Sequence, residues 1–550
     1  MTGSWMQRVL ETVRPRGGRY TLLTDDTSSS EQQKSLRYRR LARIAIFIVP
    51  IWLILLFINY HHPLRRPATQ TQSSGPEASF VHFLLSATAG TTSFCRTLYS
   101  AGALNYPTPR IINWDATFKD RHRPDKGESL GKIDAVLDFL KKLDGAHDDE
   151  LVLIADGYDT WFQLRPEVLL ERYHAINERA RQRIWPRYGL KYYQSIVFSA
   201  QRHCEDADDD SCACSLAPPS PLSDSVYGDL TDQPTDDIMN QHVYMRPRYL
   251  NTGMTIGPAG KVRNLYEYAH QKMEDNATHY ITDRQVFSEI FGEQEYFREM
   301  VMANSSRVPE GELANDPRNG HISGDKIELD CDQCQFEIGL DYLGELSMPT
   351  IYSEAHIVQI NPNSTSTLKL PEDIRTSTPP YWTPDYSGTR PPLPFTPWSD
   401  LPLRTDRSTH TIPAAIHYHR EAPTNDTASA WSKQWYHSDL RPLLDGHAKS
   451  FRMPFAVLHD QPKIGVTHEY WGPLDGYGGV RIHHEGDLGG EWRQWDELCG
   501  SDEIGREVFG DGKDRYENPV YFLYWDAEKQ NSQLDRWIER VEGERTAGVL

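Results

Sequence analysis

The sequence predicts an α/β fold in which helices cover the faces of a mostly parallel β-sheet. Segments typical of strands and of helices alternate over residues 80–173, and this order is characteristic of βαβ units. The aliphatic run at residues 151–154 is short and is followed closely by turn residues, as expected for a buried strand. Hydrophobic residues make up 38% of the chain, which is enough for a sizeable core.

The first half of the predicted domain alternates regularly between strand and helix. In residues 132–143 hydrophobic side chains recur at helical spacing. Pro166 is allowed where it stands because proline is tolerated in the first turn of a helix. The expected elements are a strand in 81–88, a helix in 93–104, a strand in 110–114, a helix in 132–143, a strand ending at Asp156 and a helix in 166–173.

The second half is less regular. Residues 206–237 are acidic and proline-rich and are expected to form a long surface loop, in which the acidic run 208–210 is a solvated turn. The strand predicted over 249–257 contains a tight turn at Asn251 and Gly253. The other expected elements are a strand in 195–200, a helix in 261–274, an amphipathic helix in 282–291 capped by Thr282 and a strand in 413–419.

Residues 44–60 are apolar and uncharged, and about 17 residues at 1.5 Å each just span a bilayer core. Arginines precede this run directly, at positions 37, 39, 40 and 43, so the positive-inside rule places the N-terminus in the cytosol. A cleaved signal peptide and a buried core helix are the alternatives. We therefore expect a cytoplasmic tail (1–43), a transmembrane helix (44–60), a flexible stem (61–79), a globular domain (80–436) and a C-terminal extension of unknown role (437–550).

The distribution of cysteines and glycosylation sequons agrees with this topology. All seven cysteines follow the apolar run. The N-x-S/T sequons, at Asn276, Asn304, Asn363 and Asn425, follow it as well. Both patterns fit an oxidising, luminal compartment, and the Cys331-x-x-Cys334 pair is better suited to disulfide formation than to zinc because no second pair has suitable spacing. The net charge of −20 argues against a nucleic-acid partner.

The strand that ends at Asp156 carries the strongest functional signal. Asp156 and Asp159 follow the aliphatic run and are separated by Gly157 and Tyr158. Ligands in open α/β folds bind at the carboxyl ends of the strands. Two carboxylates at that edge would suit Mn²⁺ or Mg²⁺ bound to a diphosphate. The alternative is a strand–helix turn whose aspartates cap the next helix.

Several ordered segments resemble the glycosyltransferase domain of the procollagen lysyl hydroxylase and collagen glycosyltransferase group, and especially its fungal membrane-anchored relatives. The resemblance covers residues from about 80 to 436 and includes no iron site of the hydroxylase kind. It is carried by INWDATFKD, LGKIDAVLDFLKKL, DDELVLIADGYDTWFQLRPEVLL, YLNTGMTIG, TDRQVF and AIHYH, in that order.

This resemblance implies a GT-A fold, a nucleotide-sugar donor, most often a UDP-sugar, and Mn²⁺ (or Mg²⁺). Asp156 and Asp159 would ligate the metal, and His417 or His419 would complete the site. We favour His417 because it directly follows the apolar strand residues, although His419 and Arg420 replace the Asn-Gly-type turn usual in the family. Residues implied near the donor or the acceptor are Tyr158 at the uracil ring, Lys132 and Trp114 near the donor, and Asp283 and Asn251 near the sugar or acceptor.

Each of these residues also has a purely structural interpretation. Asp283 would complement a helix dipole, Asn251 would hold a turn, Trp114 would pack in the core and Lys132 would lie on a helix surface. The leading hypothesis is a single-pass type II glycosyltransferase of the Golgi or ER membrane, acting on a glycan or glycoprotein acceptor. A non-catalytic GT-A module that binds glycans or serves as a scaffold, and a metal-dependent phosphohydrolase, are the competing hypotheses.

Overall fold

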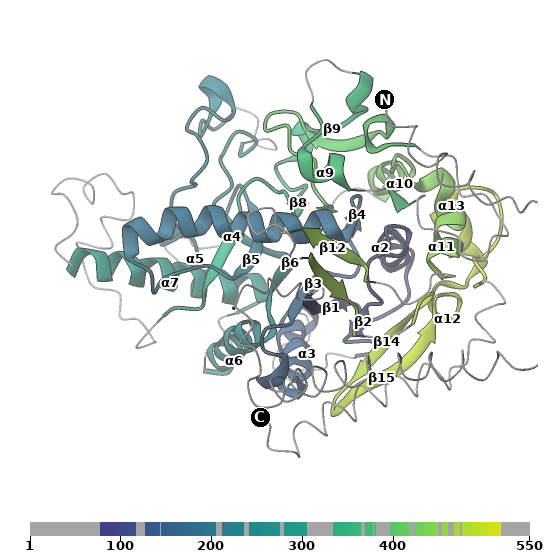
Figure 1. The fold of residues 1–550 in the computed structure, drawn as a ribbon, viewed down its shortest axis with the longest axis horizontal. Helices are drawn as coiled ribbons and strands as arrows, with labels where there is room; N and C mark the ends of the chain where they lie inside the picture. Colours follow the sequence, from purple (N-terminus) through teal and green to yellow (C-terminus); the bar gives the residue numbers. More distant parts are fainter. Residues whose placement is uncertain are drawn as a thin grey trace, which may run out of the picture. The chain divides into compact units, whose positions relative to one another are not determined.

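The structure is a computed structural model that describes residues 77–116, 127–143, 145–204, 212–235, 241–275, 280–304, 334–364, 369–377, 379–380, 396–418, 424–448, 454–459, 467–473 and 476–518. These residues form an α/β fold with a large mixed, mostly parallel sheet flanked by helices, as predicted (Figure 1). The predicted cytoplasmic tail and membrane helix, and nearly all of the stem, lie outside them. Among the described residues no helix combines the length and the apolar character needed to cross a membrane.

The main sheet has ten strands, and its order is β15-β14-β2-β1-β3-β6-β5-β7; β13 also pairs with β1, and β12 pairs with β13. Both β2 and β3 pair with β1 in parallel, whereas β6 is antiparallel to β3. The end of β3, at Asp156, therefore lies in the middle of one sheet edge. The bounds of the central strands are β1 Glu77–Ser86, β2 Arg110–Ile112, β3 Leu151–Asp156, β5 Ile196–Gln201, β6 Tyr249–Pro258 and β7 Ile338–Asp341.

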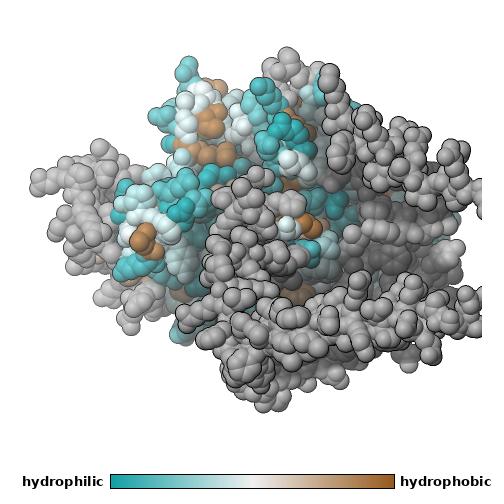
Figure 2. All heavy atoms as spheres, viewed as in Figure 1, coloured by the Kyte–Doolittle hydropathy of each residue, from teal (hydrophilic) through white to brown (hydrophobic). Residues whose placement is uncertain are grey.

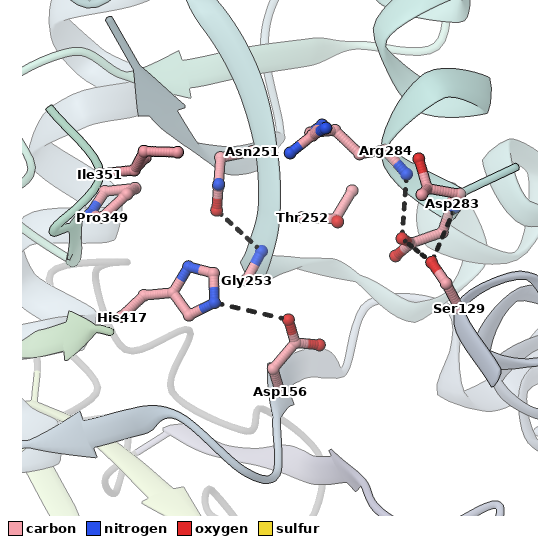
Figure 3. Close-up of a pocket in the computed structure, with 11 residues that line it drawn as sticks. Ser129, Asp156, Asn251, Thr252, Gly253, Asp283, Arg284, Pro349, Ile351 and His417 are labelled. Atoms are coloured by element: carbon pink, nitrogen blue, oxygen red, sulfur yellow. Dashed lines mark hydrogen bonds and ion pairs between the residues drawn. The ribbon is translucent and has the colours of Figure 1, made fainter. Parts of the chain in front are cut away.

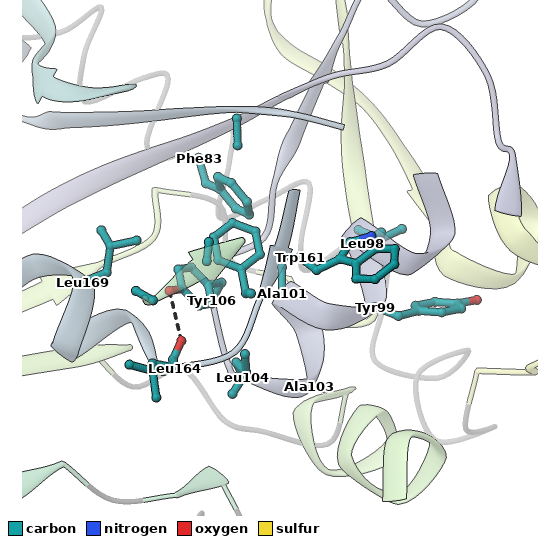
Figure 4. Close-up of a cluster of buried hydrophobic side chains, with 14 of the residues drawn as sticks. Phe83, Leu98, Tyr99, Ala101, Ala103, Leu104, Tyr106, Trp161, Leu164 and Leu169 are labelled. Atoms are coloured by element: carbon teal, nitrogen blue, oxygen red, sulfur yellow. Dashed lines mark hydrogen bonds between the residues drawn. The ribbon is translucent and has the colours of Figure 1, made fainter. Parts of the chain in front are cut away.

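Two hydrophobic layers lie on opposite faces of this sheet because successive side chains of a strand alternate between its faces. Val152 and Ile154 of β3 pack with α3 (Gly127–Lys142), α6 (Ala259–Asp275) and α7 (Asp283–Asn304). Leu153 faces the other layer, which contains residues of α2 (Thr92–Ala103) and α4 (Pro166–Tyr188). Figure 4 shows part of this second layer, where Phe83 and Tyr106 lie close to the short strand that carries Trp161.

A small second sheet adds to the edge at which β3 ends. Its central strand, β11 (Ala415–His417), is antiparallel to β4 (Thr160–Phe162) and parallel to β8 (Ser347–Pro349). His417 pairs with Thr160 in this register. Since β4 begins directly after the turn that contains Asp159, β11 brings His417 to the same turn.

The tight turn predicted at Asn251 and Gly253 is wrong, because β6 is one continuous strand. Gly253 instead lies in a bulge, and Asn251 is the paired residue at one end of it. Phe198 of β5 pairs with Thr255, whereas Ser199 pairs with Asn251, so residues 252–254 are left out of the ladder with β5. Pairing with β3 on the other side of β6 keeps the strand extended through Thr255 and Met254.

The other predicted elements are present, with shifted ends. The helix expected over 166–173 continues to Tyr188, past Pro186, and the predicted cap is confirmed because the Gln285 amide donates to the Thr282 hydroxyl at 3.2 Å. Part of the loop expected over 206–237 is ordered by the Cys204–Cys214 disulfide and the short helix α5 (Cys212–Ser215). The acidic run 208–210 lies outside the described residues. The remaining elements of this part are β9 Ile357–Ile360, α9 Glu372–Thr376, β10 Leu403–Asp406, α10 Thr424–Ser432 and α11 Leu440–Ala448.

The segment after residue 436 contributes to the same sheet and the same core. β13 pairs with the start of β1, and β14 pairs with β2, both in parallel. The buried Cys499 forms a disulfide with Cys95 of α2. The elements of this segment are β12 Ala456–His459, β13 Thr467–Trp471, β14 Gly479–His484, β15 Asp487–Gln494, α12 Trp495–Cys499 and α13 Asp502–Phe509.

The Cys95–Cys499 and Cys204–Cys214 disulfides indicate an extracellular or luminal compartment, because such bonds persist where the environment is oxidising. On the face shown in Figure 2, exposed hydrophobic side chains occur as small separate groups among hydrophilic ones. The large hydrophobic residues exposed among those described are Leu190, Tyr193, Leu230, Ile281 and Val457.

Candidate functional site

Two carboxylates and one imidazole meet at the carboxyl end of β3. The side chains are those of Asp156, Asp159 and His417, and one potential ligand atom of each lies within 4.8 Å of the others. His417 Nε2 is 3.3 Å from Asp159 Oδ1 and 3.6 Å from Asp156 Oδ2. Residues far apart in the chain therefore present three potential metal ligands to one point.

The backbone fixes all three residues in place. Asp156 ends β3, and the Gly157 amide donates to the Ser86 carbonyl of the neighbouring strand at 2.9 Å. The Tyr418 amide donates to the Asp159 carbonyl at 2.8 Å, which ties the end of β11 to the turn. Because both groups are held by main-chain hydrogen bonds, the imidazole and the carboxylates are positioned before any ligand binds.

Gly253 lies directly against the His417 ring. A methyl group built on Gly253 would lie within 2.6 Å of three imidazole atoms, Nδ1, Cε1 and Cγ. The β6 bulge therefore brings backbone without a side chain up to the histidine. The Gly253 amide also donates to Asn251 Oδ1 at 3.0 Å, and Asn251 Nδ2 donates to Gln201 Oε1 at 2.8 Å, so these contacts support the bulge.

Lys132 is buried beside the carboxylates rather than exposed on the surface of α3. Its ammonium group donates to Asp156 Oδ1 at 2.6 Å and to the Thr252 carbonyl at 2.9 Å, and it lies 3.5 Å from Asp283 Oδ2. Only 4% of the residue is exposed. Asp156 Oδ1 is thus engaged by Lys132, while Oδ2 faces His417.

Asp283 begins α7 and is buried at the same site. Its Oδ1 accepts hydrogen bonds from the Ser129 hydroxyl at 2.7 Å and from the Arg284 amide at 2.9 Å. The contact with the Arg284 amide, at the start of α7, agrees with the structural role at a helix terminus that the sequence suggested for Asp283. The contacts with Ser129 and Lys132 add a link between α3 and α7 across the site.

The electrostatics of the site reflect crowded negative charge. Burial raises the pKa of Asp156, and Asp159 raises it further, while Lys132 opposes both. Burial alone would lower the pKa of His417, but Asp159 and Asp156 outweigh it, and the pKa is raised. Positive charge is therefore favoured between the two aspartates.

The donor set fits a divalent cation. Asp159 Oδ1 is buried, and its one charged contact among the described residues is His417 Nε2, at 3.3 Å. An oxygen in that condition is destabilised unless a cation or a proton lies close to it. Two carboxylates with one imidazole form a mixed oxygen and nitrogen set, which suits Mn²⁺ better than Mg²⁺.

A cavity of about 180 Å³ opens next to these groups (Figure 3). In Figure 3, Asp156 and His417 lie on one side of it, and Asp283 with Ser129 lies on another. Its wall combines charged, amide and apolar side chains, and the polar groups among them could orient a ligand. The lining residues are Ser129, Asp156, Asn251, Thr252, Gly253, Thr282, Asp283, Arg284, Pro349, Ile351 and His417.

Tyr158 and Trp114 lie by the loop that follows β1. The Tyr158 hydroxyl accepts hydrogen bonds from the amides of Thr88 and Ala89, at 2.7 and 3.0 Å. Trp114 packs against Phe94 with ring centroids 5.4 Å apart. Its neighbours Asn113 and Asp115 both have left-handed backbone angles, with φ of 67° and 56°. Such angles are uncommon outside glycine and are concentrated at functional sites.

The structure thus brings six predicted residues into direct contact or along one cavity: Lys132, Asp156, Asp159, Asn251, Asp283 and His417. His419 lies outside the described residues. Ser129 and the contact of Gly253 with His417 were not predicted from the sequence. No local pattern marks Ser129, whereas the glycine of Asn251-Thr252-Gly253 was visible but was assigned to a turn.

The sequence was compared with protein-family models and with curated proteins. No protein-family model matches the sequence, and a search of curated proteins finds no match. The function must therefore be inferred from the site itself.

Proposed function

We propose that the protein is a metal-dependent glycosyltransferase of the GT-A type that uses a nucleotide-sugar donor, with a UDP-sugar favoured. The observation that supports this proposal most directly is the convergence of Asp156, Asp159 and His417 beside a polar cavity. A divalent cation held by these residues, Mn²⁺ in preference to Mg²⁺, would stabilise the charge that develops on a departing nucleoside diphosphate.

The base of the nucleotide would lie toward Tyr158 and Trp114. Both are half-buried and pack against the large hydrophobic cluster, so they offer aromatic surface at its margin. The loop after β1 restrains the ring of Tyr158 through its hydroxyl, which keeps the ring in place for stacking. The left-handed residues on each side of Trp114 hold that side chain at the same loop, because the Asp115 amide donates to the Thr88 carbonyl at 3.0 Å.

The sugar would occupy the cavity on the other side of the acidic pair. The Asp283 carboxylate can accept further hydrogen bonds there, and Asn251 and Thr252 add polar groups to the wall. Lys132 contacts both Asp156 and Asp283, so it fixes the carboxylate beside the proposed diphosphate position relative to the carboxylate beside the proposed sugar position. Positioning of this kind is a major source of rate enhancement when two substrates must meet.

The location that fits this activity is the lumen of the Golgi or ER, with the domain anchored by residues 44–60 as a type II membrane protein. The Cys95–Cys499 and Cys204–Cys214 disulfides support a luminal or extracellular domain. The acceptor would be a glycan or glycoprotein.

The decisive experiment measures nucleotide binding and turnover on the purified full-length protein. Calorimetry with UDP and a panel of UDP-sugars, with Mn²⁺ or with a chelator, should show metal-dependent binding that Asp156→Asn and Asp159→Asn abolish. Asp134→Asn is the matched control, because this carboxylate is on α3 but is exposed and pairs with His270. Release of free UDP would support glycosyl transfer or donor hydrolysis.

The same experiment distinguishes the competing hypotheses. Binding of glycans without any nucleotide-sugar binding would favour a non-catalytic GT-A module. Phosphate release without UDP release would favour a metal-dependent phosphohydrolase. Equal binding by the wild type and both aspartate variants would contradict the proposed role of the acidic pair.

A further inference from the structure

Arg110 is a buried cation two strands away from β3. It begins β2 and is 3% exposed, and it pairs in register with Arg481 of the adjacent parallel strand β14, which is also buried. Paired residues of neighbouring strands project to the same face of a sheet. Two arginines therefore lie next to each other in the layer between the sheet and α3.

The contacts of Arg110 are poor for a buried guanidinium group. Nη2 donates to the Gly489 carbonyl at 3.4 Å, which is long for such a bond. Nη1 is buried and donates to no atom of the described residues, and the guanidinium carbon lies 5.2 Å from the centre of the Phe139 ring. Within the described part of the chain, no carboxylate approaches Arg110 to 4.0 Å.

A bound anion would compensate the buried positive charge of Arg110. Burial lowers the pKa of Arg110 to about 9, and Arg481 acts in the same direction, while Asp487 opposes them. Arg110 therefore remains charged at neutral pH. An ion buried without a partner costs several kcal/mol. A water molecule could accept a hydrogen bond from Nη1 but would leave the charge uncompensated.

A small cavity lies beside Arg110. Its volume is about 10 Å³, which is close to the minimum that holds one water-sized particle. Two other polar side chains in its wall are already engaged, since His82 Nε2 contacts Glu150 Oε2 at 2.6 Å and the Thr108 hydroxyl donates to the Gly476 carbonyl. The space excludes phosphate, sulfate and carboxylate groups, and leaves Arg110 as the group that would bind a small ion.

We propose that this cavity binds one monatomic anion of the chloride class through the Arg110 guanidinium group. The proposal does not depend on the proposed glycosyltransferase activity, because the site shares no residue with the acidic pair or its cavity. The net charge of −20 opposes anion binding over long distances. Contact with Arg110 outweighs it because Coulomb energy rises as distance falls and salt screens the distant charges.

Thermal unfolding of the full-length protein tests this site. Tryptophan fluorescence is followed in sodium chloride and in sodium gluconate at equal ionic strength. A ligand that binds only the folded state raises Tm, so we expect wild-type Tm to be higher in chloride by on the order of 2 °C. Arg110→Met should remove the difference. Arg96→Met should retain the difference in Tm between the two salts. Arg96 is also buried and lies 6.0 Å from the centre of the Trp431 ring, but it does not line the cavity beside Arg110.

Equal Tm values of the wild type in the two salts would overturn the proposal, and so would a chloride effect that survives in Arg110→Met. If Arg110→Met does not fold, crystals of the wild type grown in sodium bromide provide the second test. An anomalous bromide peak in contact with Arg110 is the expected result. A water molecule at that position, with no anomalous signal, would refute the site.

Discussion

Replacing Gly253 with alanine should displace His417 without altering any charged group. The new methyl carbon would lie within 2.6 Å of three ring atoms, whereas ordinary contacts of such a carbon begin at 3.4 Å. The nearest of these atoms, Nδ1, would be 2.2 Å away, so the imidazole must retreat by about 1.2 Å to reach an ordinary contact distance. Metal–ligand distances tolerate only about 0.2 Å. The histidine would leave a position that suits a cation shared with Asp156 and Asp159.

The expected result is a loss of about 10- to 100-fold in Mn²⁺ affinity, which is the usual effect of changing a residue that orients a metal ligand. Overpacking adds a loss of about 1–3 kcal/mol in the free energy of unfolding. Titration of Mn²⁺ into the full-length protein, followed by electron paramagnetic resonance, measures the affinity. Urea unfolding measures the stability.

Gly145→Ala is the matched control, because a methyl group there would meet no atom within 4 Å. It should leave Mn²⁺ affinity unchanged. If Gly253→Ala remains folded and binds Mn²⁺ as tightly as the wild type, then His417 is not a ligand held by this contact, and the three-residue metal site is wrong.

Three further results are expected from the full-length protein. Lys132→Met should lower the free energy of unfolding by about 2 kcal/mol. This loss is small for a broken buried ion pair because the Asp156 side chain is 32% exposed, and Mn²⁺ should restore part of it. Unchanged urea unfolding would contradict this expectation. Replacing Cys95 and Cys499 by alanine should remove about 4–5 kcal/mol and lower Tm, because the bond closes a loop with a sequence separation of 404; an unchanged Tm would show that the C-terminal segment is not held there. Burial lowers the pKa of His447 to about 3, so between pH 6.5 and 3 the unfolded chain takes up this proton and the folded chain does not. The free energy of unfolding therefore decreases as the pH is lowered through this range. From pH 7 to 5 the wild type should lose about 2 kcal/mol more than His447→Gln in urea unfolding, and equal losses would refute the assignment.

The acidic pair could be predicted because all the information lies in one short segment. The aliphatic residues before Asp156 make a strand that is buried on both faces, which is typical of the centre of a parallel sheet. The position of the pair at the sheet edge follows from that. The helix cap at Thr282 was equally local, since a hydroxyl and the glutamine three residues later suffice to define it.

Gly253 shows why local signals mislead elsewhere. An Asn-x-Gly sequence favours a turn. Here β3 and β5 pair on opposite sides of β6, and these ladders keep the backbone extended. The surplus residues form a bulge instead, and the glycine accommodates His417, a residue of another sheet. No pattern within the segment contains that information.

The C-terminal segment was unassigned for a similar reason. β14 and β15 are rich in glycine, histidine and charged residues and have no clear period of two. The segment is held by parallel pairing of β14 with β2, by antiparallel pairing of β15 with β14, and by a buried tryptophan, Trp495, that lies against Tyr99 of α2. These contacts link residues far apart in sequence, so only the folded chain shows that the segment is integral to the sheet.

The charges in contact at the site argue for a divalent cation rather than a monovalent one. Three carboxylates, of Asp156, Asp159 and Asp283, and one ammonium group, of Lys132, leave two negative charges when His417 is neutral, and Arg284 adds one positive charge on the cavity wall. A dication beside Asp156 and Asp159 offsets both charges of the contacting groups, whereas a monovalent cation offsets one. The raised pKa of His417 has the same origin, because a proton on the imidazole offsets half of that excess. Under the proposed function an anionic diphosphate would enter together with the metal, and we therefore expect chelation to abolish nucleotide binding rather than merely slow turnover.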